Sequence, residues 1–98
     1  MKLVAIYNKP ENPAAFDQAY FNTHIPLIKQ VPGIRQTRIT RFTRGVVGGD
    51  DLYLMAEMFF EDKDALKTAM RSEEMGRAGE NLDSFAKGLY TLVYAEEE

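Results

Sequence analysis

Apolar residues along this chain gather in four short stretches that are typical of β-strands. We predict strands over residues 2–8, 34–44, 52–60 and 89–95. The first is an apolar run that ends in polar residues and Pro10, and the second is rich in β-branched Ile and Thr. Three glycines and two aspartates within residues 45–51 predict a flexible hairpin loop between the two middle strands.

A helix is predicted to follow the first strand. Asn12 can cap its first turn, and Pro13 suits the first helical position because a proline there loses no hydrogen bond. Apolar and aromatic residues then recur at helical spacing as far as His24. Because Pro26 has no N–H to donate, we expect a break or kink near residues 24–25 and a short continuation to Gln30.

A second helical region separates the last two strands. It opens at Glu61 and Asp62, can restart behind a cap at Ser72, and stops at Gly88. The order of elements is therefore β-α-β-β-α-β, which is the ferredoxin-like α+β arrangement. We predict a single domain over residues 1–98, with a four-stranded antiparallel sheet and helices on one face only.

The strand over residues 52–60 carries apolar residues on both of its faces. Leu54, Ala56 and Met58 share one face by their spacing, whereas Tyr53, Met55 and Phe59 share the other. The helices can cover only one face, and a soluble monomer rarely exposes an apolar sheet of this size. We therefore expect a homodimer in which two sheets pack face to face.

Composition and charge exclude several kinds of function. The 98 residues contain no cysteine and one histidine, which argues against thiolate chemistry, iron–sulfur clusters and zinc fingers, and predicts no metal site. The net charge of −3 does not favour a nucleic acid as partner. The apolar runs are too short for a membrane span or a secretory signal, so we expect a cytoplasmic protein.

His24 is the main candidate for chemistry, because it is the side chain whose ordinary pKa lies nearest neutrality. It follows Tyr20 by one helical turn and precedes Pro26. From position alone, a structural role for His24 is the commoner alternative, and a single histidine can also serve as an axial haem ligand.

Glu57 is a second candidate, because this carboxylate lies among apolar residues of a predicted strand. Burial would raise its pKa and suit it to act as a general base. The commoner alternative is an ion pair with an arginine of the neighbouring strand. Four arginines lie there, and we expect them to be solvated and ion-paired rather than to bind an anion: Arg35, Arg38, Arg41 and Arg44.

Tyrosines on the predicted strands are candidates for ligand binding. Tyr7, Tyr53 and Tyr90 offer apolar area with a polar hydroxyl, which suits the wall of a small-molecule pocket. The same side chains would also suit a dimer interface, and the sequence does not separate these two uses.

Most of the chain resembles proteins of the EthD family. The resemblance rests on residues 2–13, on residues 16–35 with their Thr-His-Ile-Pro core at 23–26, and on Ala-Glu-Met-Phe-Phe at 56–60. It implies a ferredoxin-like subunit that dimerises through its sheet into an α/β barrel. The family is named for ethyl tert-butyl ether degradation, and related barrels include cofactor-free monooxygenases, polyketide cyclases and muconolactone isomerases.

The resemblance and the residues leave two functions open. The first is an enzyme of small-molecule catabolism that acts without a cofactor on a hydrophobic or carbonyl compound inside the barrel. In that case His24 is the general acid or base, with Tyr20 and Glu57 as further catalytic residues. Isomerisation or cyclisation suits them better than hydrolysis, because no nucleophile with a base is visible. The second is a non-catalytic protein that binds a ligand for a partner enzyme.

Overall fold

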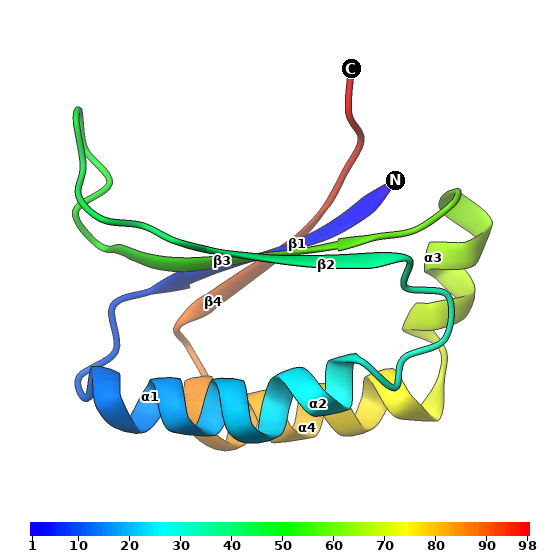
Figure 1. The fold of residues 1–98 in the computed structure, drawn as a ribbon, viewed down its shortest axis with the longest axis horizontal. Coiled ribbons are helices and arrows are strands. Elements are labelled where there is room, and N and C mark those ends of the chain that lie inside the picture. The colour runs from blue at the N-terminus through cyan, green and yellow to red at the C-terminus, as the bar shows by residue number, and fades with distance from the viewer.

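One four-stranded antiparallel sheet packs against a layer of helices in the computed structural model, which describes residues 1–98 (Figure 1). The sheet has the strand order β2-β3-β1-β4. This confirms the predicted ferredoxin-like arrangement, although the second strand is shorter than expected. The strands are β1 (Lys2–Asn8), β2 (Gln36–Arg41), β3 (Leu52–Phe59) and β4 (Tyr90–Ala95).

The first helical segment runs without interruption through α1 (Pro13–Ala19), a π-helical turn η1 (Tyr20–His24) and α2 (Ile25–Ile28). The side chain of Asn12 caps α1 by accepting from the Ala15 N–H at 3.1 Å. The helix does not break before Pro26, but the regular α-helical pattern is interrupted there and a short helix continues beyond it. At this point the Ile25 N–H donates to the Tyr20 carbonyl, five residues back, so the helix widens around the proline instead of stopping.

The second helical region forms two helices, α3 (Lys63–Met70) and α4 (Glu73–Ala86). Their predicted starts are correct, because Asp62 and Ser72 cap them by accepting from backbone N–H groups three residues later. Figure 1 shows α4 beside α1 and α2 beneath the sheet, with α3 at one end of it. None of these helices is long and apolar enough to cross a membrane.

Alternate residues of β1 face opposite sides of the sheet. Leu3, Ala5 and Tyr7 belong to the hydrophobic core between the sheet and the helices. Val4 is only 7% exposed but lies outside that core. The strand therefore contributes to two separate surfaces, one on each side of the sheet.

No helix covers the second of these surfaces (Figure 1). We call it the outer face. The antiparallel registers place on it alternate residues of all four strands: Lys2, Val4, Ile6, Gln36, Arg38, Thr40, Met55, Glu57, Phe59, Thr91, Val93 and Ala95. The apolar side chains of this face lie among polar and charged ones.

Tyr53 does not lie on the outer face, which corrects the prediction that it shares a face with Met55. Tyr7 pairs with Leu54 and Asn8 pairs with Leu52, so Tyr53 is the extra residue of a β-bulge. The bulge turns Tyr53 toward the helices, where its hydroxyl donates to Asp17 of α1 at 2.7 Å.

Candidate functional site

A cavity of about 230 Å³ lies between the sheet and the helices. Of its 17 lining residues, 13 are hydrophobic, and they come from all four strands, η1, α2, α3 and α4. The polar side chains in the wall are few: Tyr7, Tyr20, His24 and Thr37. A largely apolar hollow with a few converging polar groups is typical of a small-molecule site.

His24 ends the π-helical turn and is 3% exposed. Its Nδ1 lies 3.2 Å from Oδ1 of Asn81 on α4. Since an amide oxygen only accepts, this contact assigns the ring proton to Nδ1 and leaves a lone pair on Nε2. Burial lowers the pKa of His24, although Asn81 and the Ala78 carbonyl partly oppose that shift. The imidazole is therefore a neutral base at physiological pH.

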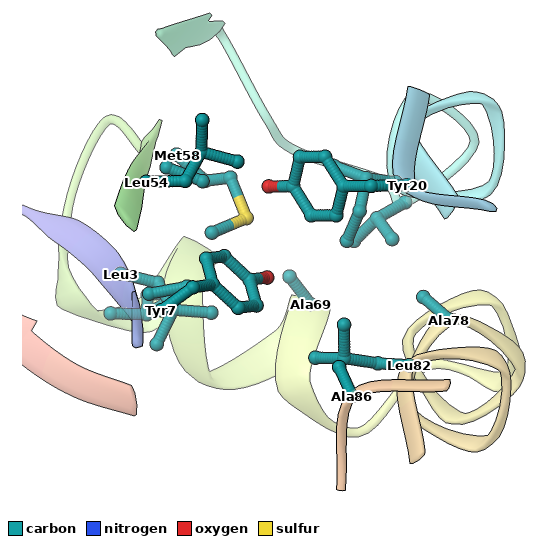
Figure 2. Close-up of a cluster of buried hydrophobic side chains, with 14 of the residues drawn as sticks. Leu3, Tyr7, Tyr20, Leu54, Met58, Ala69, Ala78, Leu82 and Ala86 are labelled. Carbon is teal, nitrogen blue, oxygen red and sulfur yellow. The ribbon is translucent and has the colours of Figure 1, made fainter. Parts of the chain in front are cut away.

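Tyr7 and Tyr20 present their hydroxyls to the same space from opposite sides. Each side chain is 1% exposed, and the two ring centroids lie 5.1 Å apart with the rings edge to face. In Figure 2 the hydroxyl of Tyr7 points from the sheet and that of Tyr20 from the helices. The Tyr20 ring lies 5.4 Å from the His24 ring, so these three side chains form one cluster.

Burial keeps both tyrosines protonated. It raises the pKa of Tyr20 to about 12, although the nearby Tyr7 hydroxyl lowers that value somewhat. The pKa of Tyr7 is raised further by burial and by its neighbour Tyr20. The cluster thus combines two neutral hydroxyl donors with one neutral imidazole base.

The structure does not bring Glu57 to this cluster. Glu57 lies on the outer face, where its carboxylate accepts from Lys2 Nζ at 2.7 Å. The predicted ion pair therefore forms with a lysine of β1 and not with an arginine of β2. Arg38 lies opposite Glu57 in the register, but its guanidinium stacks over the Phe59 ring.

Of the three tyrosines predicted to bind a ligand, Tyr7 alone lines the cavity. The Tyr53 hydroxyl donates to Asp17, and the Tyr90 hydroxyl donates to Asp83. Both of these hydrogen bonds fix a strand to a helix at the edge of the core. Two of the four arginines predicted to be ion-paired form such pairs, Arg41 with Asp17 at 3.1 Å and Arg35 with Glu61 at 3.6 Å.

Asn81, which orients His24, is a residue of the site that the sequence prediction lacks. A signal was present, because Asn81 lies three residues after Ala78 and four before Phe85, on the face of α4 that packs inward. Met58, Met70 and Met75 also line the cavity, and the sequence alone does not point to them.

The structure holds no group of three or more His, Asp or Glu side chains arranged to bind a metal ion. A family model, the EthD domain, matches residues 8–88 of the chain. The chain belongs to the EthD family. This confirms the resemblance that residues 16–35 carried.

Two relatives match this EthD protein over almost their whole length. A crystal structure of an EthD family protein from Bacillus halodurans is 42% identical, with a TM-score of 0.94, over 99% of this chain and 97% of that one. An uncharacterized 11.0 kDa protein in the thcB–thcC intergenic region of Rhodococcus erythropolis is 32% identical over 99% of this chain and 94% of its own length.

More distant structures share the fold. A dimeric ferredoxin-like protein of unknown function from Jannaschia is 17% identical, with a TM-score of 0.73, over 98% of both chains. SnoaB, a cofactor-independent oxygenase from Streptomyces nogalater, is 18% identical, with a TM-score of 0.66, over 99% of this chain and 93% of its own.

Proposed function

We propose that this EthD protein binds a small hydrophobic or carbonyl compound in the cavity between its sheet and helices and transfers a proton through His24. The observation that supports the proposal most directly is the burial and hydrogen bonding of His24. It is buried in the cavity wall, it is held by Asn81 through Nδ1, and it is left with a basic Nε2.

The chemistry that suits this site is acid–base catalysis without a cofactor. Isomerisation, dehydration or cyclisation of a carbonyl compound requires a base and hydrogen-bond donors, and Tyr7 and Tyr20 are such donors. The fold relative SnoaB is described as cofactor-independent, which supports the view that this architecture can work without a bound group. Glu57 has no part in the proposed reaction, because it lies on the other side of the sheet.

We also propose that the protein is a homodimer formed through the outer face. Val4, Met55 and Phe59 lie on that face, and no helix of the same chain covers it (Figure 1). The Jannaschia relative of this fold is described as dimeric, which supports a dimer here. A second copy would add an equivalent sheet and cover both outer faces at once.

The second candidate function is non-catalytic binding of a hydrophobic ligand for a partner enzyme. The wall of the cavity favours it in one respect, because 13 of its 17 residues are hydrophobic. The cavity would then serve to bind the apolar part of the ligand, and His24 would only hold the ligand by a hydrogen bond.

Proton exchange separates the two functions without knowledge of the natural substrate. The ketone 2-tetralone has acidic hydrogens next to its carbonyl, and their replacement by deuterium from D₂O is followed by mass spectrometry. We expect the protein to accelerate this exchange. His24→Asn keeps a hydrogen-bond donor near Asn81 but removes the base, so it should bind the ketone and abolish the acceleration. Exchange that persists in His24→Asn contradicts the catalytic role of His24.

A further inference from the structure

Two glycines of α4, Gly76 and Gly79, lie one helical turn apart and line the cavity. Glycine destabilises a helix interior relative to alanine. Neither glycine has a positive φ, and a Cβ added at either position would meet nothing within 4 Å. Backbone conformation and internal packing therefore do not require glycine here. Both glycines are exposed, so what they provide is open space at the mouth of the cavity.

Tyr7 and Tyr20 both line the cavity, and their hydroxyls lie between the sheet and the helices (Figure 2). Apart from each other, they have no protein group in hydrogen-bonding position. Each side chain is 1% exposed, so bulk water does not solvate it freely. In the free protein the Tyr7 hydroxyl is directed at the Tyr20 oxygen. A ligand oxygen that replaces this mutual contact can accept from both hydroxyls, which suits an oxygen atom that carries or develops negative charge.

The rest of the wall suits a flat, unsaturated body. Met58, Met70 and Met75 line the cavity and offer thioether groups, which make favourable contacts with aromatic rings and adapt to their shape. The cavity volume of about 230 Å³ leaves room for one or two fused rings but not for a large cofactor.

We propose that the ligand is a compact aromatic or conjugated ketone, or its enol, whose oxygen accepts hydrogen bonds from Tyr7 and Tyr20 and whose rings extend along Gly76 and Gly79. This rests on the proposed function and names its substrate class. Tyr7 and Tyr20 hold the oxygen, His24 exchanges the proton, and the two glycines leave room for the rings.

The proton transfer balances without a further reactant. His24 Nε2 accepts the proton from the carbon next to the carbonyl, and the electron pair of that C–H bond forms the C=C bond of an enolate. The negative charge on oxygen is stabilised by the two tyrosine hydroxyls. Return of the proton to the same carbon, or to another carbon of the conjugated system, restores the ketone without oxidation or reduction.

The test uses 2-naphthol, which resembles the enol of 2-tetralone, and naphthalene as a matched ligand without oxygen. Binding to the full-length protein is measured by ligand-observed NMR. We expect 2-naphthol to bind at least about tenfold more tightly than naphthalene, because two hydrogen bonds are added in a buried site. Tyr7→Phe and Tyr20→Phe should each reduce this preference and leave the affinity for naphthalene unchanged. Equal affinities for the two probes in the unmodified protein overturn the assignment of the tyrosine hydroxyls.

Gly79→Ala and Gly79→Leu test the other half of the proposal. The added methyl of alanine has space in the free protein, so Gly79→Ala should raise the melting temperature. Gly79→Leu should weaken the binding of 2-naphthol and of naphthalene to a similar extent. Unchanged affinities in Gly79→Leu overturn the position of the rings. If Tyr7→Phe and Tyr20→Phe keep the full preference for 2-naphthol, the assigned role of the hydroxyls is wrong. Deuterium exchange that depends on His24 would then still support the proposed function. If neither probe binds the unmodified protein, this ligand class is wrong.

Discussion

Nζ of Lys2 lies 2.7 Å from Oε2 of Glu57, on the sheet face that carries no helix. The two side chains are 19% and 12% exposed in the single chain. The hydrogen bond to Glu57 raises the pKa of Lys2 against a smaller opposing effect of burial. In the proposed dimer this pair lies within the interface.

The ion pair predicts an asymmetry between single and double variants. Glu57→Leu should weaken the dimer, because it leaves the ammonium group of Lys2 with only the longer contact to the exposed Glu97, at 3.8 Å. Lys2→Met combined with Glu57→Leu removes both charges and should restore much of the dimer, since an apolar pair can replace a buried ion pair. Dimer dissociation constants from sedimentation compare the variants. A double variant weaker than Glu57→Leu alone contradicts the placement of the pair in the interface.

Substitutions of neighbouring residues in β3 should separate assembly from folding. Met55→Asp places a charge on the outer face, and we expect a folded monomer. Leu54→Asp buries a charge in the core, where Leu54 has no exposed surface, and we expect it to unfold the chain. Tyr53→Asp is the control, because Tyr53 faces α1 and the dimer should persist. Sedimentation and circular dichroism measure both properties, and a dimer that survives Met55→Asp shows that another surface is used.

His24 should make stability depend on pH in the weakly acidic range. Burial lowers the pKa of His24 below its ordinary 6.5, so the unfolded chain takes up this proton first as the pH falls. The free energy of unfolding should therefore decrease as the pH falls from about 6.5 toward the folded-state pKa, and this contribution should level off below it. Urea unfolding at several pH values measures the effect, and His24→Asn should lack it. Identical pH dependence in the two proteins contradicts the buried, neutral state of His24.

Asn81→Leu should impair His24 without removing it. Asn81 accepts from Nδ1 and thereby fixes the ring orientation and raises its pKa. The variant should slow deuterium exchange into 2-tetralone by about tenfold or more, because the imidazole loses its fixed orientation, and NMR titration should show a lower His24 pKa. Asn81→Asp should instead raise that pKa, since it adds a negative charge beside the ring. A pKa that is the same in both variants rules out the contact.

The cap of α4 predicts a stability effect of known size. Ser72 Oγ accepts from the Met75 N–H at 3.1 Å and donates to the Ala69 carbonyl at 2.6 Å, which joins α4 to the end of α3. Ser72→Ala should lower the free energy of unfolding by about 1 kcal/mol. Ser84→Ala is a matched control, because Ser84 bonds only to a carbonyl of its own helix and is exposed. Equal losses in both variants contradict the role of the cap.

Local patterns predicted the strands and helices because spacing and caps are local properties. Asn12, Asp62 and Ser72 are capping residues in the structure, as their residue types and positions indicate. The bulge at Tyr53 could not be predicted, because it depends on the register between β1 and β3. The π-helical turn was also missed, since a proline pattern alone does not distinguish a break from a wider turn.

The site was predictable only in part. His24 was found by its residue type, and Tyr20 by its helical spacing from His24. Glu57 was grouped with them because the sequence does not tell which side of a sheet a strand residue faces. Asn81 and the two glycines depend on how α4 packs across η1, which is a tertiary contact between distant segments.

Because the side chains of β1 alternate, the strand carries two sets of positions that can change independently. Tyr7 and its alternate neighbours shape the ligand cavity, whereas Val4 and Ile6 shape the surface proposed for self-association. Ligand preference can therefore diverge between members of the family while the same quaternary arrangement is retained, and subunit contacts can diverge while the chemistry stays constant. Insertion of a single residue within β1 would exchange the two sets and disrupt both properties at once.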